Sequence, residues 1–600
     1  MSAQNFVSGP GDTLDGDATF DTDVLVVGTG PMGATTALLL ATYGIRVSAV
    51  SQYSWLANSP RAHITNQRAA EVFRDAGIEP ELHQAAMPWH LMASTGIVTS
   101  LAGRELARIP SWGCGNRAGD YREASPCEPM DLPQTLLEPV LVQHAATRGA
   151  KILFNTRYLG HVQDDEGVTV RLLDRVSGHE YTQRARYLVG ADGGSSTVAE
   201  HLGITFTGVK GKAGTVYARF RADLSRLTAH RPGVLTLVLQ SGARNGDTGT
   251  GLLRCVRPWN EWIAGWGFDP ALGEPDMSDE RALEQIRAFV GIDDLQVELL
   301  GTSLWYVNEQ FADRMSVGRV HIGGDAAHRH PPNNGLGSNT CVQDAFNLAW
   351  KLSFVIRGEA GPDLLESYSE ERQPIAQAIV GRANASRRDF AALRRVFDTQ
   401  DMAFDAVVDA LEAPTETGER IRAEFAQAVD VKRYEYQAHG FEMNQRYVSS
   451  AVIDDGSAEE VFTRDPDLYA QPSTRPGAKL PHAVLVDDKG NDVSTLDLVG
   501  KGAFTLLSGL TGGVWASAVE SLDKSWLRSL TVDGPGARDV YRTWALVRGI
   551  PEGGALLVRP DGVIAWRCEE LPASAGDACR RLSAALQAVL GLSRVESLNI

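Results

Sequence analysis

A glycine-rich turn near the start of the chain sets the strongest limit on its fold. Residues 21–50 read as an apolar strand, a glycine turn, a helix and a second apolar strand. The turn contains a GxGxxG pattern formed by Gly28, Gly30 and Gly33. In such a pattern the first glycine permits the turn, the second lets a pyrophosphate approach the backbone, and the third lets the helix pack on the strand. The stretch predicts an α/β fold with a parallel sheet that binds a dinucleotide.

The second strand of such a unit usually ends in an acidic residue that binds a ribose. Here Ser51 stands at that position, and Gln52 follows it. We therefore expect ribose recognition at Ser51 to be weaker or differently arranged.

Two later segments repeat the strand–turn–helix pattern. Residues 187–204 carry Asp192 in a glycine-rich turn, and the apolar strand Val320–Ile322 leads through Gly323 and Gly324 to Asp325. Each segment places a carboxylate and closely approaching backbone at the end of a strand. One such turn can be accidental, but both together with a GxGxxG are hard to explain by chance.

The helix after Asp325 is entered through an unusual loop. Residues 331–337 are rich in Pro, Asn and Gly, so we expect a shaped turn rather than a helix. Ser338 is placed to cap the helix that follows. A helix entered through Gly335 and Gly337 directs bare N–H groups and a positive dipole end at an anion. The alternative is a tight strand-to-helix turn without a ligand.

Length and composition exclude several classes of protein. The 600 residues suggest two to four domains, and the net charge of -18 without a basic stripe argues against nucleic acid. We find no apolar run long enough to cross a membrane and no signal pattern. The six cysteines form no CxxC pair, which fits a reducing compartment and excludes a zinc knuckle. We expect a cytoplasmic protein with a disordered tail over residues 1–18.

The rest of the chain changes character twice. Residues 206–304 contain short aromatic-rich strands, which predict a mainly antiparallel inserted sheet, and residues 96–130 look irregular. The final part reads as a small α/β domain with strands at 503–508 and 543–547, a hairpin at 560–562 and a helix at 576–590. The following tryptophans can line a pocket, although a core position is favoured for each singly: Trp259, Trp262, Trp266 and Trp305.

Taken together, the motifs resemble a known family. GTGPMG, GADGGSS and GGDAAH…PP…G.G.N…DAFNLAWKL are similar to the para-hydroxybenzoate hydroxylase family, the class A FAD-dependent aromatic hydroxylases, over residues 20–385. PRAHITNQR, RPWNEW and HRHPPNNGLGSNT resemble its phenol hydroxylase branch. Residues 475–600 resemble the thioredoxin-like domain of phenol hydroxylases. This domain lacks the dithiol, which argues for a structural or oligomerising role.

The resemblance implies a domain plan. It places a Rossmann-like (GR2-type) FAD-binding domain at 19–205 and 305–385, with a substrate-binding sheet inserted at 206–304. Residues 96–130 would contribute to the substrate region. A helical region and linker at 386–474 would precede the thioredoxin-like domain.

The resemblance also assigns roles to residues. The glycine turn holds the FAD pyrophosphate, Asp192 serves FAD and NAD(P)H, and Asp325 binds the ribityl chain. His63 matches the active-site histidine, expected to bond the substrate's phenol oxygen. The cofactor-binding set is Gly28, Gly30, Gly33, Ser51, Arg61, Gln134, Asp192, Asp325, Pro332, Gly335, Gly337, Ser338 and Asn339. Apart from the resemblance, we predict Trp262, Trp305 and Pro331 as substrate residues. From composition alone, Arg61 can equally be a surface cation, His63 a satisfied loop histidine and Gln134 a helix cap.

The implied reaction is ortho-hydroxylation of a phenol to a catechol. NAD(P)H reduces FAD, and O2 then gives a C4a-hydroperoxyflavin that attacks the electron-rich ring; no metal is required. A tailoring hydroxylase of polycyclic aromatic polyketides is the alternative within the family, and a flavin-binding scaffold is the non-enzymatic one. A flavin halogenase would need a WxWxIP segment and a disulfide reductase would need a dithiol, and we find neither. The family further implies a homodimer or homotetramer.

Overall fold

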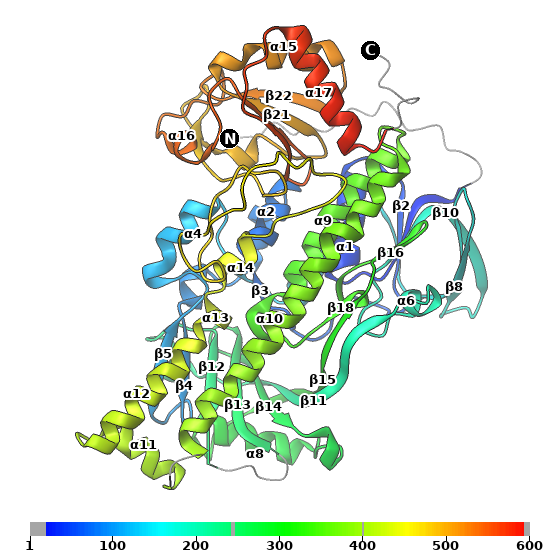
Figure 1. Ribbon diagram of the computed structural model, residues 1–600. Coiled ribbons are helices and arrows are strands. Elements are labelled where there is room, and N and C mark those ends of the chain that lie inside the picture. Colours follow the sequence, from blue (N-terminus) through cyan, green and yellow to red (C-terminus); the bar gives the residue numbers. More distant parts are fainter. Residues whose placement is uncertain (1–19, 242–246, 399–400, 593–600) are drawn as a thin grey trace.

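The computed structural model describes residues 20–241, 247–398 and 401–592. The expected tail at 1–18 lies outside the described residues. Figure 1 shows the C-terminal domain at one end of the molecule, the parallel sheet with its helices in the middle, and a large antiparallel sheet at the other end. The chain therefore has the α/β architecture with an inserted sheet that the sequence predicts.

The central sheet is built around β1 (Thr22–Val27), whose residues are all buried. Its strands run in the order β16-β17-β10-β1-β2-β7, and β1 pairs in parallel with both β2 and β10. The bounds of the other strands in this order are β2 (Val47–Val50), β7 (Lys151–Leu153), β10 (Glu180–Gly190), β16 (Ser316–Val317) and β17 (Val320–Ile322). Continuous apolar strands of this kind need cover on both faces. Helices α1 (Pro31–Thr42), α5 (Gln134–Thr147) and α9 (Gly337–Ile356) pack next to one another there.

The second sheet is mainly antiparallel, as expected. Its order is β18-β15-β11-β14-β13-β12-β4-β5, with β12 and β4 as the parallel pair. Its strands are β4 (Ser94–Val98), β5 (Glu105–Pro110), β11 (Phe206–Arg221), β12 (Leu235–Leu239), β13 (Asp247–Arg257), β14 (Glu261–Phe268), β15 (Glu298–Ala312) and β18 (His328–Arg329). The segment 96–130, expected to be irregular, is partly regular: it contains the end of β4, all of β5 and the helix α4 (Ala118–Ala124). The pairing of β4 with β12 is a tertiary contact, which local sequence does not reveal.

Long helices connect the two sheets to the C-terminal domain. Helix α10 (Glu366–Asp398) runs from the neighbourhood of that domain past α9 toward the antiparallel sheet (Figure 1). It is followed by α11 (Phe404–Glu412), α12 (Glu416–Val431), α13 (Arg433–Tyr436) and α14 (His439–Met443). Among the described helices, none is long and apolar enough to cross a membrane.

The C-terminal domain has a four-stranded sheet in the order β22-β21-β23-β24, flanked by α15 (Gly513–Leu522) and α17 (Ala575–Val589). The strands are β21 (Phe504–Ser508), β22 (Leu527–Thr531), β23 (Ala555–Val558) and β24 (Ile564–Cys568). Only β21 and β22 are parallel neighbours, which is the thioredoxin-like arrangement expected.

The strand expected at 543–547 is wrong, because these residues form the helix α16 (Thr543–Val547). The Asp539 carboxylate accepts the backbone N–H groups of Trp544 and Ala545, at 3.2 and 2.9 Å. A carboxylate that takes up free N–H groups at a helix start favours the helix over an apolar strand.

One hydrophobic core runs from the parallel-sheet region into the C-terminal domain. Trp350 on α9 is fully buried, and its ring lies 5.6 Å from that of Phe504 on β21. Phe354, one turn further along α9, contacts Trp526 at 5.4 Å in the same way. The C-terminal domain is therefore packed onto α9 through aromatic side chains.

Truncating this contact is expected to destabilise the whole protein. Trp350→Ala should lower the free energy of unfolding by about 3–5 kcal/mol, because it leaves a large cavity between two domains. Trp55→Ala removes the same side chain from a position that is 63% exposed, and should cost about 0.5 kcal/mol or less. Chemical denaturation of both variants checks the difference. Equal losses would show that the aromatic contact contributes little.

Candidate active site

The ends of three neighbouring parallel strands bring the three turn motifs together. Val27 of β1 pairs with Gly190 of β10, which in turn pairs with Ile322 of β17. The glycine turn, the Asp192 turn and the Asp325 turn each begin directly after these residues. Val50 of β2 also pairs with Val27, so Ser51 lies at the same edge. Ligands of open α/β sheets bind at this carboxyl edge.

The glycine turn fits a pyrophosphate. Gly28 has φ +110°, and a Cβ there would lie 2.1 Å from the Ala191 carbonyl oxygen; a Cβ on Gly33 would lie 2.0 Å from the Gly28 oxygen. These two glycines are required by the packing of the turn. At Gly30 the nearest heavy atom to a Cβ would be Glu138 Oε1 at 3.8 Å. The protein itself leaves Gly30 open, as close approach of a phosphate to the α1 N-terminus needs.

The two turn aspartates differ in what they do. Asp192 accepts the hydroxyl of Ser196 at 2.5 Å and the N–H groups of Thr197 and Val198 at 2.7 and 3.1 Å, so it binds the start of α6 (Thr197–His201) beside the N-cap Ser196. Asp325 lies in the 3₁₀ turn η4 (Gly324–Ala326) and is exposed between buried neighbours. Asp325 is therefore the freer carboxylate for a ligand's hydroxyl groups.

Helix α9 begins at Gly337, with Leu336 as its N-cap. Ser338 lies in the first turn, so its expected capping role is wrong: the chain is already helical one residue earlier. The loop before it contains the short 3₁₀ helix η5 (Asn333–Gly335), where Asn334 takes φ +66°. The expectation of a purely non-helical loop is thus corrected in part.

The Asn339 side chain fastens the start of α9 to the segment that carries His63. Its Oδ1 accepts the N–H of Asn66 at 2.9 Å, and its Nδ2 donates to the Ile64 carbonyl at 2.8 Å and to that of Gly335 at 2.5 Å. Both the oxygen and the nitrogen of the Asn339 amide group are therefore hydrogen-bonded within the protein. Asn339 thus positions the chain around the helix N-terminus.

Residues 61–65 run beside residues 130–134. β3 (Ile64–Thr65) pairs with β6 (Met130–Asp131), and the Gln134 N–H donates to the Arg61 carbonyl at 2.9 Å. The Arg61 side chain is exposed, whereas the Gln134 amide donates to Glu138 at 2.5 Å. The structure thus brings Arg61, His63 and Gln134 into one layer next to the motif edge. Ser51 is buried there, with its hydroxyl 3.4 Å from the Tyr53 N–H.

His63 is buried against a pair of opposite charges. Its Nδ1 lies 3.3 Å from Asp131 Oδ1, and its Nε2 lies 2.9 Å from the Pro60 carbonyl oxygen. Arg254 on β13 donates to the other oxygen of Asp131. Histidine, carboxylate and arginine form a buried triad that joins the β3–β6 pair to the antiparallel sheet.

Burial lowers the pKa of His63, and the Arg254 charge lowers it further, against the raising effect of Asp131. The ring is therefore neutral at neutral pH and carries one N–H. Both of its partners are hydrogen-bond acceptors, so a neutral ring satisfies only one of them. A ring whose N–H points at Asp131 presents an Nε2 lone pair that can accept a proton.

Sequence reasoning missed Asp131 and Arg254. A signal was present: Arg254 is the one charged residue in the apolar run Leu252–Val256, and Asp131 is a lone carboxylate between Met130 and Leu132. A charge inside an apolar strand needs a partner. The sequence does not say which partner it has.

The predicted substrate residues lie apart from one another. Trp262 is fully buried in the core of the sheet domain, and its indole donates to the Trp259 carbonyl at 3.0 Å. Trp305 on β15 is partly buried. Pro331 is buried and Pro332 is exposed at the turn before η5. Trp262 is thus placed as a core residue, the alternative that the sequence favoured.

A small aromatic cavity lies beside the same segment. Its lining residues are Ile64, Asn66, Trp112, Tyr121, Pro129, Tyr436, Ala438 and Glu442. The Trp112 indole N–H is buried and has no hydrogen-bond partner among the described residues. His63 is not among the residues that line this cavity.

The carboxyl edge of the sheet and its open glycine turn are those of a domain that binds a flavin or nicotinamide dinucleotide. Residues 21–383 match the family model of an FAD binding domain, and residues 473–592 match that of the aromatic-ring hydroxylase C-terminal domain. The 2,4-dichlorophenol 6-monooxygenase of Delftia acidovorans is 46% identical, over 95% of this chain and 98% of that protein. The phenol 2-monooxygenase of Pseudomonas sp. (strain EST1001) is 44% identical, over 92% and 91%.

A solved structure of the flavin-dependent monooxygenase PieE with FAD and substrate superposes with a TM-score of 0.90. It is 40% identical, over 95% of this chain and 99% of that chain. The chain belongs to the family of FAD-dependent aromatic-ring hydroxylases. The predicted family, fold class and cofactor are thereby confirmed, and the roles of individual residues stay predictions.

The buried acid Glu442 in the aromatic cavity gives a test by pH. Burial raises its pKa from 4.5 to about 8, with the Asn66 amide opposing. A carboxyl group whose pKa is raised on folding stabilises the protein at low pH and loses that contribution as the pH rises from about 4.5 to about 8. Glu442→Gln should therefore match the wild type near pH 5 and be more stable above pH 8, by about 4 kcal/mol.

Urea unfolding at several pH values checks this expectation. A difference between the two proteins that stays constant from pH 5 to pH 9 would contradict the raised pKa. Glu274→Gln, at an exposed carboxylate, serves as the matched control for the substitution itself.

Proposed function

We propose that the chain is a monooxygenase that hydroxylates a phenol, substituted or chlorinated, at the ortho position to give a catechol. The observation that carries the proposal is the neutral, buried His63, held by Asp131 and Arg254 next to the carboxyl edge of the sheet. The two curated relatives reported above are named for 2,4-dichlorophenol and phenol, which supports the same substrate class.

The residues present fit FAD. Gly28, Gly30 and Gly33 would hold the pyrophosphate at the α1 N-terminus, and Asp325 would bind the ribityl hydroxyls. The start of α9 at Gly337 would face the pyrimidine edge, where its dipole stabilises negative charge. When bound, FAD takes a hydride from NAD(P)H and activates O2 for transfer to the ring.

His63 would act on the substrate's oxygen. Asp131 orients the ring by accepting the Nδ1–H, which leaves the Nε2 lone pair for the phenol proton. Nε2 now faces the Pro60 carbonyl, so the phenol oxygen would replace that carbonyl as its partner. Transfer of the phenol proton to His63 raises the electron density at the carbons of the substrate ring that are ortho to the oxygen. A ring so activated reacts more readily with an electrophilic oxygen.

Two alternatives differ in the substrate. A tailoring hydroxylase of polycyclic polyketides would need a wide pocket and would be unresponsive to simple phenols. A non-enzymatic flavin scaffold would bind FAD but consume no NAD(P)H in response to any aromatic compound. The buried triad argues against the scaffold, because a scaffold has no use for a desolvated histidine base.

We further propose a cytoplasmic enzyme that forms a homodimer or homotetramer. All six cysteines are free thiols, which supports a reducing compartment. Sedimentation of the purified holoprotein gives the oligomer.

The function is tested with purified yellow protein and a panel of substituted phenols. NAD(P)H oxidation should accelerate with one group of phenols, and a catechol should form in proportion. Formation of H2O2 alone with every phenol would refute the proposal. If only polycyclic substrates stimulated the reaction, the polyketide alternative would take its place.

His63→Ala should retain FAD but lose catechol formation by roughly 100-fold, as expected for a general base. The loss should be greatest at pH values below the pKa of the phenol, because a phenolate needs no base. Asp131→Asn should give a smaller loss with the same pH trend.

Catechol yield per NAD(P)H consumed, measured from pH 6 to pH 10, checks this prediction. His179→Ala, on an exposed turn, is the matched control and should behave as wild type. A His63→Ala enzyme with wild-type coupling at every pH would remove His63 from the mechanism.

A further inference from the structure

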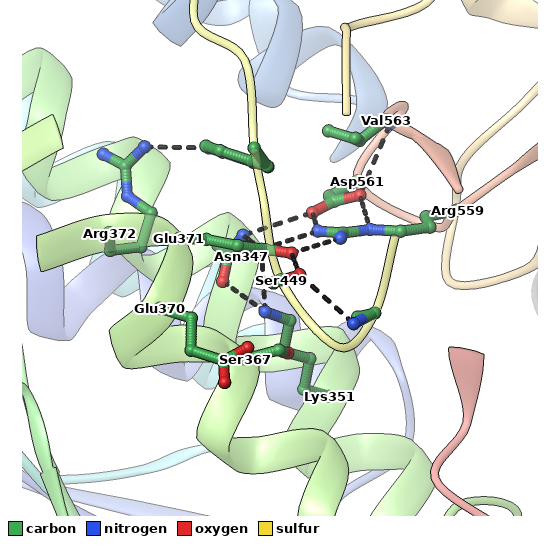
Figure 2. Close-up of polar contacts among 12 residues, drawn as sticks. Asn347, Lys351, Ser367, Glu370, Glu371, Arg372, Ser449, Arg559, Asp561 and Val563 are labelled. Atoms are coloured by element: carbon green, nitrogen blue, oxygen red, sulfur yellow. Dashed lines mark hydrogen bonds and ion pairs between the residues drawn. The ribbon is translucent and has the colours of Figure 1, made fainter. Parts of the chain in front are cut away.

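A buried network of charges joins the C-terminal domain to the FAD-binding domain (Figure 2). Arg559 and Asp561 lie in the turn between β23 and β24, 0% and 2% exposed. The two terminal nitrogens of Arg559 donate to the two carboxylate oxygens of Glu371 on α10, at 2.5 and 2.9 Å. Arg559 Nε also donates to Asp561 Oδ1 at 3.0 Å. The hairpin thus binds a buried carboxylate of the other domain through a bidentate guanidinium contact.

Glu371 collects further donors from α9. The Lys351 ammonium lies 2.8 Å from its Oε2, and the Asn347 amide donates to the same oxygen at 2.5 Å. Burial opposes ionisation of Glu371, but Arg559 and Lys351 outweigh it and hold its pKa well below the usual range. Two cations and two carboxylates balance in the interior. Removal of one of them leaves a buried charge without compensation.

The same helical turn of α10 is also hydrogen-bonded to the end of β17 and, through α9, to the loop that carries Asp325. Arg372, next to Glu371, donates to Asp344 Oδ1 on α9 at 2.7 Å. The other oxygen of Asp344 accepts the N–H of Gly324 at 3.0 Å, and lies 2.8 Å from His328 Nε2. The Tyr368 hydroxyl donates to the Ile322 carbonyl at 2.9 Å.

Tyr368, Glu371 and Arg372 are three and four residues apart, so they share one face of α10. Arg559 therefore fixes Glu371 on the face of α10 that locates Gly324 and, beside it, Asp325. An interface that served only to hold two domains together would need no buried ions, because apolar side chains of similar volume stabilise as well or better. The ions impose a defined orientation, which an apolar contact does not.

We propose that Arg559 is a positioning residue for the FAD site, through which the C-terminal domain fixes the turn that carries Asp325. This proposal rests on the contact between Asp325 and the FAD ribityl chain proposed above. The thioredoxin-like domain, which has no dithiol, then lies outside the cofactor site but supports its geometry through α10.

The test measures FAD release from the full-length holoprotein, followed by the rise in flavin fluorescence after dilution. Arg559→Leu should weaken FAD retention by on the order of tenfold and alter the visible circular dichroism of the bound flavin. Arg74→Leu is the matched control. It breaks another contact between the same domains, Arg74–Asp497 at 2.6 Å, at the far end of α2 (Gln67–Asp75). It should lower the melting temperature and leave FAD release and the flavin spectrum unchanged.

Wild-type FAD release and spectrum in Arg559→Leu would overturn the proposal. So would an equal weakening in Arg74→Leu, because the effect would then be general destabilisation. If Arg559→Leu fails to fold, Arg559→Lys decides: it keeps the charge and loses the two-pronged contact. Partial weakening is expected in that variant, and unchanged release overturns the proposal.

Asp325→Asn separates this inference from the proposed function. Unchanged FAD release in that variant would overturn the ribityl contact itself, and the inference with it. Weakened release there, beside unchanged release in the Arg559 variants, would overturn only the positioning role.

Discussion

The pairing of β1, β10 and β17 is the constraint on which the cofactor site depends. Val27, Gly190 and Ile322 end three adjacent parallel strands at one level, although they are far apart in the chain. Each strand end turns immediately into a motif, so the register brings the glycine turn and both aspartate turns to one edge. A shift of one residue in either pairing would move a carboxylate along the strand and turn its side chain to the opposite face. The site is thus a consequence of hydrogen-bond register before any side chain is considered.

Local sequence predicts what depends on local physics. The GxGxxG turn, the buried strands and the helix after Gly337 follow from glycine geometry and apolar periodicity, and all are where the sequence placed them. The segment at 543–547 was misread because its apolar residues suit a strand. Its helix depends on Asp539, a cap four residues earlier whose direction the sequence does not show. Likewise, β4 joins the second sheet through a partner more than a hundred residues away.

The candidate active site also has one part that the sequence predicts and another that depends on tertiary contacts. His63 was found by resemblance, and its position beside Gln134 follows from the short pairing of β3 with β6. Asp131 and Arg254 were not found, because their meeting requires the two sheets to be packed together. Their joint effect on His63 is also beyond the sequence: burial and Arg254 lower its affinity for a proton, and Asp131 partly restores it. The proton affinity of His63 thus depends on its burial and on two tertiary contacts, with Asp131 and Arg254, rather than on the histidine itself.

The buried ions between α9, α10 and the C-terminal hairpin raise the question of why charges are used there at all. Taking four charges out of water is costly, and the neighbouring contact of Trp350 with Phe504 shows that this interface can be built from aromatic rings. A ring contact tolerates sliding and rotation, whereas a guanidinium bound through two nitrogens to one carboxylate fixes both distance and angle. The aromatic contacts therefore supply the affinity between the domains, and the ions supply the geometry. Since Arg372 follows Glu371 directly and holds Asp344, that geometry is passed on to the backbone of Gly324. If Asp325 binds the ribityl chain as proposed, its turn is where a fixed angle matters most.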